Sequence, residues 1–276
     1  MAAAIGAFFI LWQSIYAVAA DLTCADASAL PDNLQAALEP VVVAAVYDGD
    51  TLRLRDGRRL RLTGVNAPEL PRDGRGGQAQ AEAAKRAVAR WLPADGHIYL
   101  LKSRSGEDRY GRLLAYVFDA QGSSLEVELL AQGLAFALVV PPDVRHAECY
   151  RQLERRAQAQ QKGVWGSNAW RPLRAKEALA RGRSGYMRLA GRVTRIDRNR
   201  DTWIELDDAL VLKVAAKNNR YFSAGEIDQL LGREVVVRGW LVRRSLAAGA
   251  KAKGFKAGVM EIQSRYAFES GFIDKN

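Results

Sequence analysis

Residues 41–70, VVVAAVYDGDTLRLRDGRRLRLTGVNAPEL, constrain the fold more than any other stretch of the chain. Val41–Tyr47 is an apolar, β-branched run, and leucine alternates with arginine on both sides of Asp56-Gly57. Such alternation is typical of strands with one buried face, and Asp-Gly between two strands indicates a hairpin. We therefore predict consecutive strands here, with their leucines facing a core.

The turn between the two leucine-containing strands decides which residues lie opposite each other. Leu54 and Leu60 can share a face as cross-strand partners only if an odd number of residues connects the strands. The simplest connection is the three residues Asp56–Arg58, and this register places Arg53 beside Arg61.

Asp50 lies one step beyond the leucines of its strand and on the same face, where a sheet or barrel opens to solvent. A carboxylate at such a rim can hold a metal ion. Arg61 falls on the opposite face, so bringing these two side chains together needs a bulge or a sharp bend. In the purely structural alternative, Asp48–Thr51 is a simple turn and Asn66–Glu69 is a loop before a helix.

The following elements complete a small domain. We predict a helix over 78–92 that stops at Pro93, strands over 97–102 and 112–118, a short helix from Ser123 or Ser124 to Gly133, and a helix capped by Asp143 that ends near Gly163. The order β-β-β-α-β-β-α-α suits a five-stranded OB-like barrel with packed helices.

The second half of the chain reads as a separate β module. Residues 168–185 are rich in Arg and Ala and bounded by glycines, which indicates a basic, partly helical linker. From Tyr186 to about 270, three strands, a helix and two more strands suggest a second, smaller OB-like β domain. Trp203, Tyr221 and Trp240 are candidates for stacking on nucleic-acid bases, with burial in a core as the alternative.

The N-terminus has the character of a targeting segment. Residues 1–20 carry no charged side chain and end in Ala17-Val18-Ala19-Ala20, which indicates a signal peptide, with a retained membrane anchor or neither as alternatives. Both main options place the rest of the chain outside the cytoplasm, secreted or periplasmic, with 21–37 as an N-terminal extension. An oxidising compartment would permit a Cys24–Cys149 disulfide, and two free thiols are the alternative.

The amino-acid composition limits the kinds of binding partner that this protein is expected to have. The 276 residues are enough for two modest domains, and 41 Lys and Arg against 31 Asp and Glu give a net charge of +10. This excess favours a polyanion or an anionic surface as partner. The two histidines and two cysteines form no cluster with zinc spacing, so any metal must rest on oxygen ligands.

Several separated motifs resemble the staphylococcal nuclease (thermonuclease) family in order and spacing. They are DGDT at 48–51, RLTGVNAPE at 61–69, DRYGR at 108–112, AYVF at 115–118 and QGLA at 132–135. The resemblance covers roughly residues 40–165 and implies an OB-fold barrel over 38–167. The module over 186–270 is similar to the C-terminal OB-like segments of some bacterial nuclease-family proteins.

The resemblance implies a Ca2+ site. Asp50 would be the main ligand of the ion, and Asn66 and the backbone carbonyl of Ala67 would be the other two ligands. Asp48 would stabilise these ligands without binding the ion itself. The family usually has Asp where this chain has Asn66, so one negative charge is missing and we expect weaker Ca2+ binding.

The resemblance also assigns catalytic and substrate-binding residues. Glu69 would orient or deprotonate the attacking water, Arg61 and Arg112 would clamp the phosphoryl group, and Arg109 and Tyr110 would contact the nucleotide. The tyrosines that line the family's nucleotide pocket have no match, because this chain reads FALVVPPD at 136–143.

The reading that these signals favour is an exported, Ca2+-dependent nuclease that hydrolyses DNA and/or RNA. One alternative keeps the nuclease fold for binding nucleic acid or another polyanion, with little or no turnover. A third is an envelope protein anchored by residues 1–20 whose basic faces dock on anionic lipid. No protein partner can be inferred.

Overall fold

The computed structural model describes residues 38–270, apart from 73, 75, 248 and 250–254. The predicted signal or anchor, the extension over 21–37 and the Cys24 end of the predicted disulfide lie outside the described residues. The chain divides into two compact units. The first comprises the residues up to Ala137 together with Arg145–Val164. The second comprises Leu138–Val144 together with the residues from Trp165 onward. In the described part, no helix combines the length and apolar character needed to cross a membrane.

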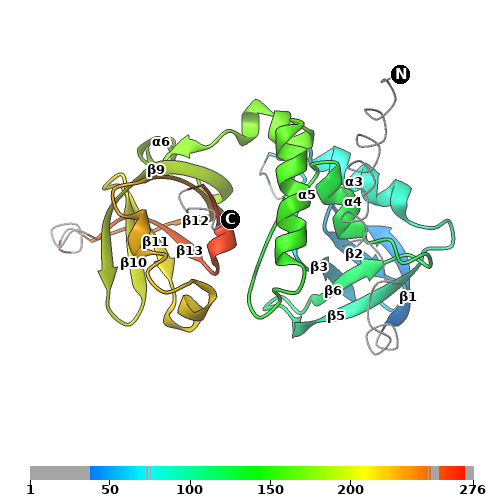
Figure 1. Cartoon of the computed structure of the whole chain (residues 1–276). Helices are drawn as coiled ribbons and strands as arrows, with labels where there is room; N and C mark the ends of the chain where they lie inside the picture. The colour runs from blue at the N-terminus through cyan, green and yellow to red at the C-terminus, as the bar shows by residue number, and fades with distance from the viewer. Residues whose placement is uncertain (1–37, 73, 75, 248, 250–254, 271–276) are drawn as a thin grey trace, which may run out of the picture. The chain divides into compact units, whose positions relative to one another are not determined.

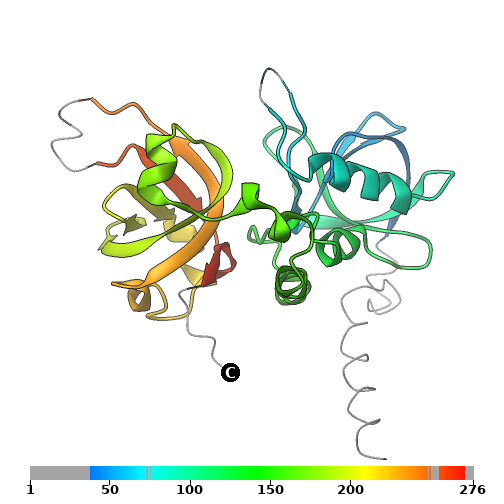
Figure 2. The same ribbon diagram turned by 90° about the horizontal axis from the view of Figure 1, so that it is seen from above.

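The first unit is a closed five-stranded barrel with helices packed on it, as the sequence predicts. Its strands are β1 (Glu39–Val46), β2 (Thr51–Leu54), β3 (Arg59–Leu62), β5 (His97–Glu107) and β6 (Leu113–Phe118). They close in the order β1-β2-β3-β6-β5, in which only β3 and β6 run parallel. Figures 1 and 2 show from two sides that these strands curl around one core.

The alternation of leucine and arginine builds this barrel. Leu52, Leu54, Leu60 and Leu62 are at most 1% exposed and lie in the core. Fully burying each leucine stabilises the fold by roughly 1.5–3 kcal/mol.

The register of β2 and β3 differs from the predicted one by two residues. Leu52 lies opposite Leu60 and Arg53 opposite Arg59, and the three-residue loop is 55–57 because the Leu54 N–H bonds to the Arg58 carbonyl. A three-residue hairpin needs its last loop residue in the left-handed region, and Gly57, at φ 90°, meets this need. The odd loop length was right, so the leucines keep their predicted face while every pair shifts.

Short strands and helices cover the barrel. They are β4 (Val65–Asn66), which pairs with β7 (Phe136–Ala137), and the helices α3 (Ala81–Trp91), α4 (Leu125–Ala131) and α5 (Ala147–Ala159). Ser124 caps α4 by accepting the Val127 N–H. The prediction that Asp143 caps α5 was wrong: the helix begins after His146, and the Asp143 N–H bonds to the Val140 carbonyl in the preceding turn.

Five strands of the second unit form another barrel with the same strand order. They are β9 (Gly185–Arg198), β10 (Thr202–Leu206), β11 (Leu210–Val214), β12 (Glu234–Arg243) and β13 (Gly258–Ile262). They run β9-β10-β11-β13-β12, and β12 pairs back with β9 to close the ring. Again the third and fifth strands are the parallel pair, which confirms an OB-like second domain. The short helices η4 (Ala216–Tyr221) and η5 (Asp228–Leu230) connect β11 to β12.

Residues 168–185 are packed into the second unit, in contrast to the linker expected there. They form η3 (Asn168–Trp170), β8 (Leu173–Arg174) and α6 (Ala175–Ala180), following η2 (Gly163–Gly166). Strand β8 pairs with β9, and Ala175 and Ala178 are fully buried in this unit's core, so their small apolar side chains serve packing. At the other end of the unit, η6 (Arg265–Ala267) leads into β14 (Phe268–Ser270), which pairs with β12.

A buried carboxyl group in the first unit predicts a pH-dependent stability. Glu126 is completely buried and accepts hydrogen bonds from the Ser124 hydroxyl and the Val117 N–H, and its burial raises its pKa to about 8. The folded protein therefore holds a proton that the unfolded chain, with a glutamate pKa near 4.3, releases. We expect stability to fall as pH rises from about 4.5 to 8, by at most about 1.4 kcal/mol per pH unit from this group.

Glu126→Gln keeps the shape of the side chain and removes its titration. We expect the unfolding free energy of this variant, measured by urea denaturation at a series of pH values, to lose this part of its pH dependence. An exposed control, Glu148→Gln, should leave the pH profile unchanged. A profile for Glu126→Gln that overlays the wild type would contradict the prediction.

Candidate active site

The turn before β2 aims Asp50 toward the β3 arginine. The Tyr47 N–H bonds to the Thr51 carbonyl at 2.9 Å, and the Asp50 N–H bonds to Oδ1 of Asp48 at 3.0 Å. A Cβ at Gly49 would stand 2.7 Å from the Ala67 Cβ, so only glycine fits this approach. Asp48 thus shapes the turn, and this turn provides the bend that the strand pattern required.

Asp50 and Arg61 meet inside the protein. Nη2 of Arg61 lies 3.0 Å from Oδ2 of Asp50, and both side chains are at most 10% exposed. The same carboxylate oxygen accepts the Ala67 N–H at 2.7 Å. Ala67, whose carbonyl was predicted as a metal ligand, therefore contacts Asp50 through its N–H, and no described residue donates a hydrogen bond to that carbonyl.

Arg61 is held by more than Asp50. Nη1 donates to the carbonyls of Leu62 and Val65 at 2.7 and 2.8 Å, and Nη2 donates to Oδ1 of Asn66 at 3.1 Å. These three hydrogen bonds engage three of the five N–H groups of the guanidinium, and Nη2 also forms the ion pair with Asp50. The predicted ligand atoms of Asp50 and Asn66 thus converge on one nitrogen that carries positive charge.

Glu69 lies near Asp50 and Arg61 and is exposed to solvent. Its main chain is fixed by Gln78, whose side chain accepts the Glu69 N–H at 2.7 Å and whose N–H donates to the Glu69 carbonyl at 2.8 Å. The residue is exposed, yet partial burial of its carboxyl raises its pKa. The charge of Asp48 raises this pKa further, whereas Arg61 and Arg112 lower it, so these four groups lie within electrostatic reach.

The carboxylates outnumber the arginines here. Burial raises the pKa of Asp50, Arg61 lowers it, and the charges of Asp48 and Glu69 raise it again. The charges of Asp48 and Glu69 act on Asp50, and that of Asp48 acts on Glu69, so a bound cation would relieve the repulsion among these three carboxyl groups.

Arg112 is oriented by Asp108, which the sequence analysis quoted within DRYGR without giving it a role. Asp108 accepts Nε of Arg112 at 2.7 Å and the backbone N–H groups of Arg112 and Tyr110 at 3.0 and 2.8 Å. Partial burial opposes ionisation, but these hydrogen bonds lower the pKa of Asp108. Both Nη atoms of Arg112 are left without a hydrogen bond to the described residues, so they can bind an oxyanion.

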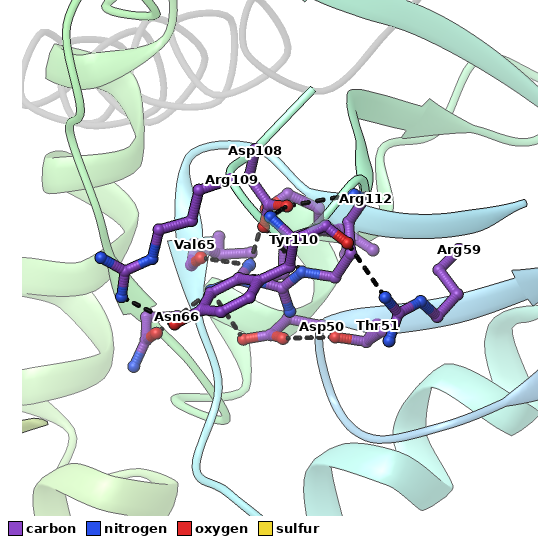
Figure 3. A network of polar contacts seen from close by, with 11 residues as sticks. Asp50, Thr51, Arg59, Val65, Asn66, Asp108, Arg109, Tyr110 and Arg112 are labelled. Atoms are coloured by element: carbon purple, nitrogen blue, oxygen red, sulfur yellow. Dashed lines mark hydrogen bonds and ion pairs between the residues drawn. The ribbon is translucent and has the colours of Figure 1, made fainter. Parts of the chain in front are cut away.

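Tyr110 and Arg109 lie on the arm between β5 and β6, beside Arg112. The Tyr110 side chain is 58% exposed, its hydroxyl accepts Nη2 of Arg109 at 2.7 Å, and its carbonyl accepts Nη2 of Arg59 at 3.0 Å. Figure 3 shows these contacts together with the bond between Thr51 and Asp50. An exposed aromatic ring among arginines is suited to contact a nucleotide.

A second exposed tyrosine escaped the sequence analysis. Tyr47, directly before Asp48, is 46% exposed, and the guanidinium carbon of Arg72 lies 4.4 Å from its ring centroid. Its position at the end of an apolar strand suggested a core residue, and only its place directly before the acidic turn could have signalled otherwise.

Comparison with known proteins identifies the family of this chain. The family model described as Staphylococcal nuclease homologue matches residues 59–167. A thermonuclease of Staphylococcus intermedius is 33% identical over 130 residues, which cover 46% of this chain and 76% of that protein. The chain belongs to the staphylococcal nuclease family. A thermonuclease of Staphylococcus hyicus is also 33% identical, over 129 residues that cover 45% of this chain and 75% of that protein.

Another relative matches a larger part of this chain. Endonuclease YhcR of Bacillus subtilis (strain 168) is 28% identical over 224 residues, which cover 74% of this chain and 17% of that protein. A match to 74% of the chain must extend beyond residue 167 into the second barrel. The similarity to that endonuclease is therefore not confined to the nuclease barrel.

Proposed function

We propose that this protein is a Ca2+-dependent nuclease that hydrolyses phosphodiester bonds of DNA and/or RNA. The observation that carries the proposal is the contact of Arg61 with the oxygens of Asp50 and Asn66, with Glu69 in electrostatic reach of both Arg61 and Arg112, in a staphylococcal nuclease barrel. The relatives named as thermonucleases and endonucleases support the same class of reaction.

The residues fit a hard cation in donor type and in charge. Asp50, Asn66 and the Ala67 carbonyl offer only oxygen atoms, and the surplus of negative charge favours a cation. Among the described residues, no three His, Cys, Asp or Glu side chains come together as a metal site, and here Asn66 supplies an amide oxygen instead. Bound there, Ca2+ would supply Lewis-acid neutralisation of the charge that grows on the phosphoryl oxygens.

The chain's own groups account for the proton and the phosphate. Glu69, with its raised pKa, would take a proton from the attacking water as the new P–O bond forms and the ester P–O bond breaks, and the departing ester oxygen would take a proton from solvent. Arg112, fixed by Asp108, would donate its Nη hydrogen atoms to the phosphoryl oxygens. Arg61 would join it only if Nη2 exchanges Asp50 and Asn66 for phosphate, while Arg109 and Tyr110 contact the nucleotide.

We further propose that the protein is exported and acts outside the cytoplasm. Residues 1–20 support this by their apolar, uncharged sequence with small residues at the end. N-terminal sequencing of protein from a host cell would test it, and a mature chain that begins near Asp21 is the expected result. Full-length protein in the membrane fraction would favour the anchored alternative.

The test of function is cleavage of denatured DNA and of RNA over a wide range of Ca2+ concentration, with chelator as reference. We expect Ca2+-dependent cleavage, and Asn66→Asp should lower the Ca2+ concentration for half-maximal rate by about tenfold, because it adds a charge to the ligand set. Asn168→Asp, at an exposed residue, makes the same charge change elsewhere and should have no effect. An Asn66→Asp curve identical to the wild type would remove Asn66 from the metal site.

A binding protein without turnover is the second candidate, because Asn66 lacks the usual charge and Arg61 is already engaged. It predicts no cleavage at any Ca2+ concentration while nucleic acid is still bound. Activity gained in Asn66→Asp would then identify the missing carboxylate as the cause.

A further inference from the structure

The positive charge of this protein is concentrated in its second barrel. Residues 165–270 contain 21 Lys and Arg against 11 Asp and Glu, whereas residues 38–164 contain 19 against 16. The net charge is thus +10 in the second part and +3 in the nuclease part. Electrostatic attraction therefore favours binding of a polyanion to the second barrel over the barrel that carries the candidate active site.

An aromatic residue faces outward on this barrel. Along β10 the inward residues are buried, whereas Trp203 is half-buried on the outer face, opposite Lys213 of β11. Nζ of Lys213 lies 5.5 Å from the Trp203 ring centroid. Trp203 is therefore not a core residue, unlike the neighbouring Ile204, and its ring is accessible from solvent.

Two exposed cations lie near the end of the barrel where β10 begins. Asp201 holds the β9–β10 loop against η4, because its carboxylate accepts the Ala216 N–H and pairs with Nζ of Lys213, both at 3.0 Å. Arg200 directly precedes Asp201 and Lys217 directly follows Ala216, so these two cations flank that contact along the chain. Both are exposed and form no ion pair with a described residue.

Arg220 lies three residues after Lys217 in the short helix η4, so the two cations share one face of that helix. It is exposed, and its guanidinium carbon lies 5.0 Å from the ring centroid of Tyr221, which is half-buried. We call Arg200, Trp203, Lys217, Arg220 and Tyr221 the basic end of the second barrel.

We propose that the basic end of the second barrel binds single-stranded nucleic acid. Its cations would pair with successive phosphates, and the rings of Trp203 and Tyr221 would stack with unpaired bases. Single strands are favoured over duplexes because only unstacked bases expose their faces to such rings. The second and third strands of an OB barrel, here β10 and β11, carry this kind of ligand in other proteins.

The test uses the whole chain in chelator, so that binding is measured without cleavage. We measure the anisotropy of a fluorescent oligothymidylate at several salt concentrations. The triple variant Arg200→Gln, Lys217→Gln, Arg220→Gln should lower the slope of log affinity against log salt by about 2, since each phosphate contact in a single strand contributes about 0.7. The matched control Arg171→Gln, Lys176→Gln, Arg183→Gln removes three exposed cations from the same unit and should keep the slope.

A separate variant tests stacking. Trp203→Leu should weaken binding on the order of tenfold and leave the salt slope unchanged, because it removes a ring and no charge. Trp240→Leu, at an exposed tryptophan on β12, is the control. Thermal unfolding of each variant verifies that the barrel remains folded.

Other outcomes would overturn the proposal. Equal losses in both triple variants would mean that net charge alone attracts the oligonucleotide. Vesicles with anionic lipid give a second binding assay. If the triple variant of Arg200, Lys217 and Arg220 lost binding to these vesicles but kept binding to the oligonucleotide, the basic end would be assigned to a membrane surface. Because chelator removes cleavage from the assay, these results do not depend on whether the nuclease proposal holds.

Discussion

Glu69→Gln is expected to lower the rate of Ca2+-dependent phosphodiester cleavage by about 10²- to 10⁴-fold, since it removes the proposed base and keeps the side-chain size. The main-chain hydrogen bonds between Glu69 and Gln78 do not involve the carboxyl group, so the loop should keep its shape. Initial rates on denatured DNA at saturating Ca2+ measure the effect.

Glu82→Gln, at an exposed glutamate in the first turn of α3, is the matched control and should cleave at the wild-type rate. Affinity for an oligonucleotide in chelator should not fall in Glu69→Gln, because the carboxylate repels phosphate and does not bind it. A Glu69→Gln rate within a few fold of the wild type would mean that Glu69 is not the base, and the proposed mechanism would fail.

Arg61→Met is expected to destabilise the first barrel by about 3–5 kcal/mol. The substitution leaves the carboxylate of Asp50 buried without its ion-pair partner and deprives the carbonyls of Leu62 and Val65 of their donor. Hydrogen exchange at the core amide of Leu62 reports the free energy of this unit by itself, which suits a chain with two domains.

Asp50→Asn in the same background separates the charge from the other contacts. The double variant should lose less than the sum of the single losses, with a coupling of at least about 1 kcal/mol, because no buried charge remains unpaired. The exposed pair of Arg58 and Asp56 provides the control cycle, in which a much smaller coupling is expected. Strictly additive losses for Arg61 and Asp50 would contradict the buried ion pair.

Local sequence patterns determined the architecture of both units. The alternation of leucine and arginine placed Leu52 and Leu60 inside the first barrel, because a strand has only two faces and water excludes one set of side chains. The same reasoning identified the second barrel between Tyr186 and residue 270. It misjudged residues 168–185, because small alanines in a basic segment look like a linker unless a surface is known to cover them.

The motifs identified the candidate site residues, and folding alone decided their contacts. The sequence named Asp50, Arg61 and Asn66, yet its strand parity separated the first two. The local Asp48 turn and the close approach of Ala67 to Gly49 reunite them, and the second of these depends on residues that meet only in the folded chain.

The state of each charged group was likewise decided by the tertiary structure. A sequence shows that an arginine is present, but its partners depend on which carbonyls and carboxylates surround it. Arg61 is enclosed by four acceptors, whereas Arg112 is held by Asp108 through Nε and its Nη atoms make no hydrogen bond to the described residues. The burial of a group and the charges beside it depend on residues that are far apart in the sequence, and no local sequence pattern encodes them. The sequence therefore determined which chemical groups this protein brings to a phosphodiester, and the fold determined which of them are available to bind it.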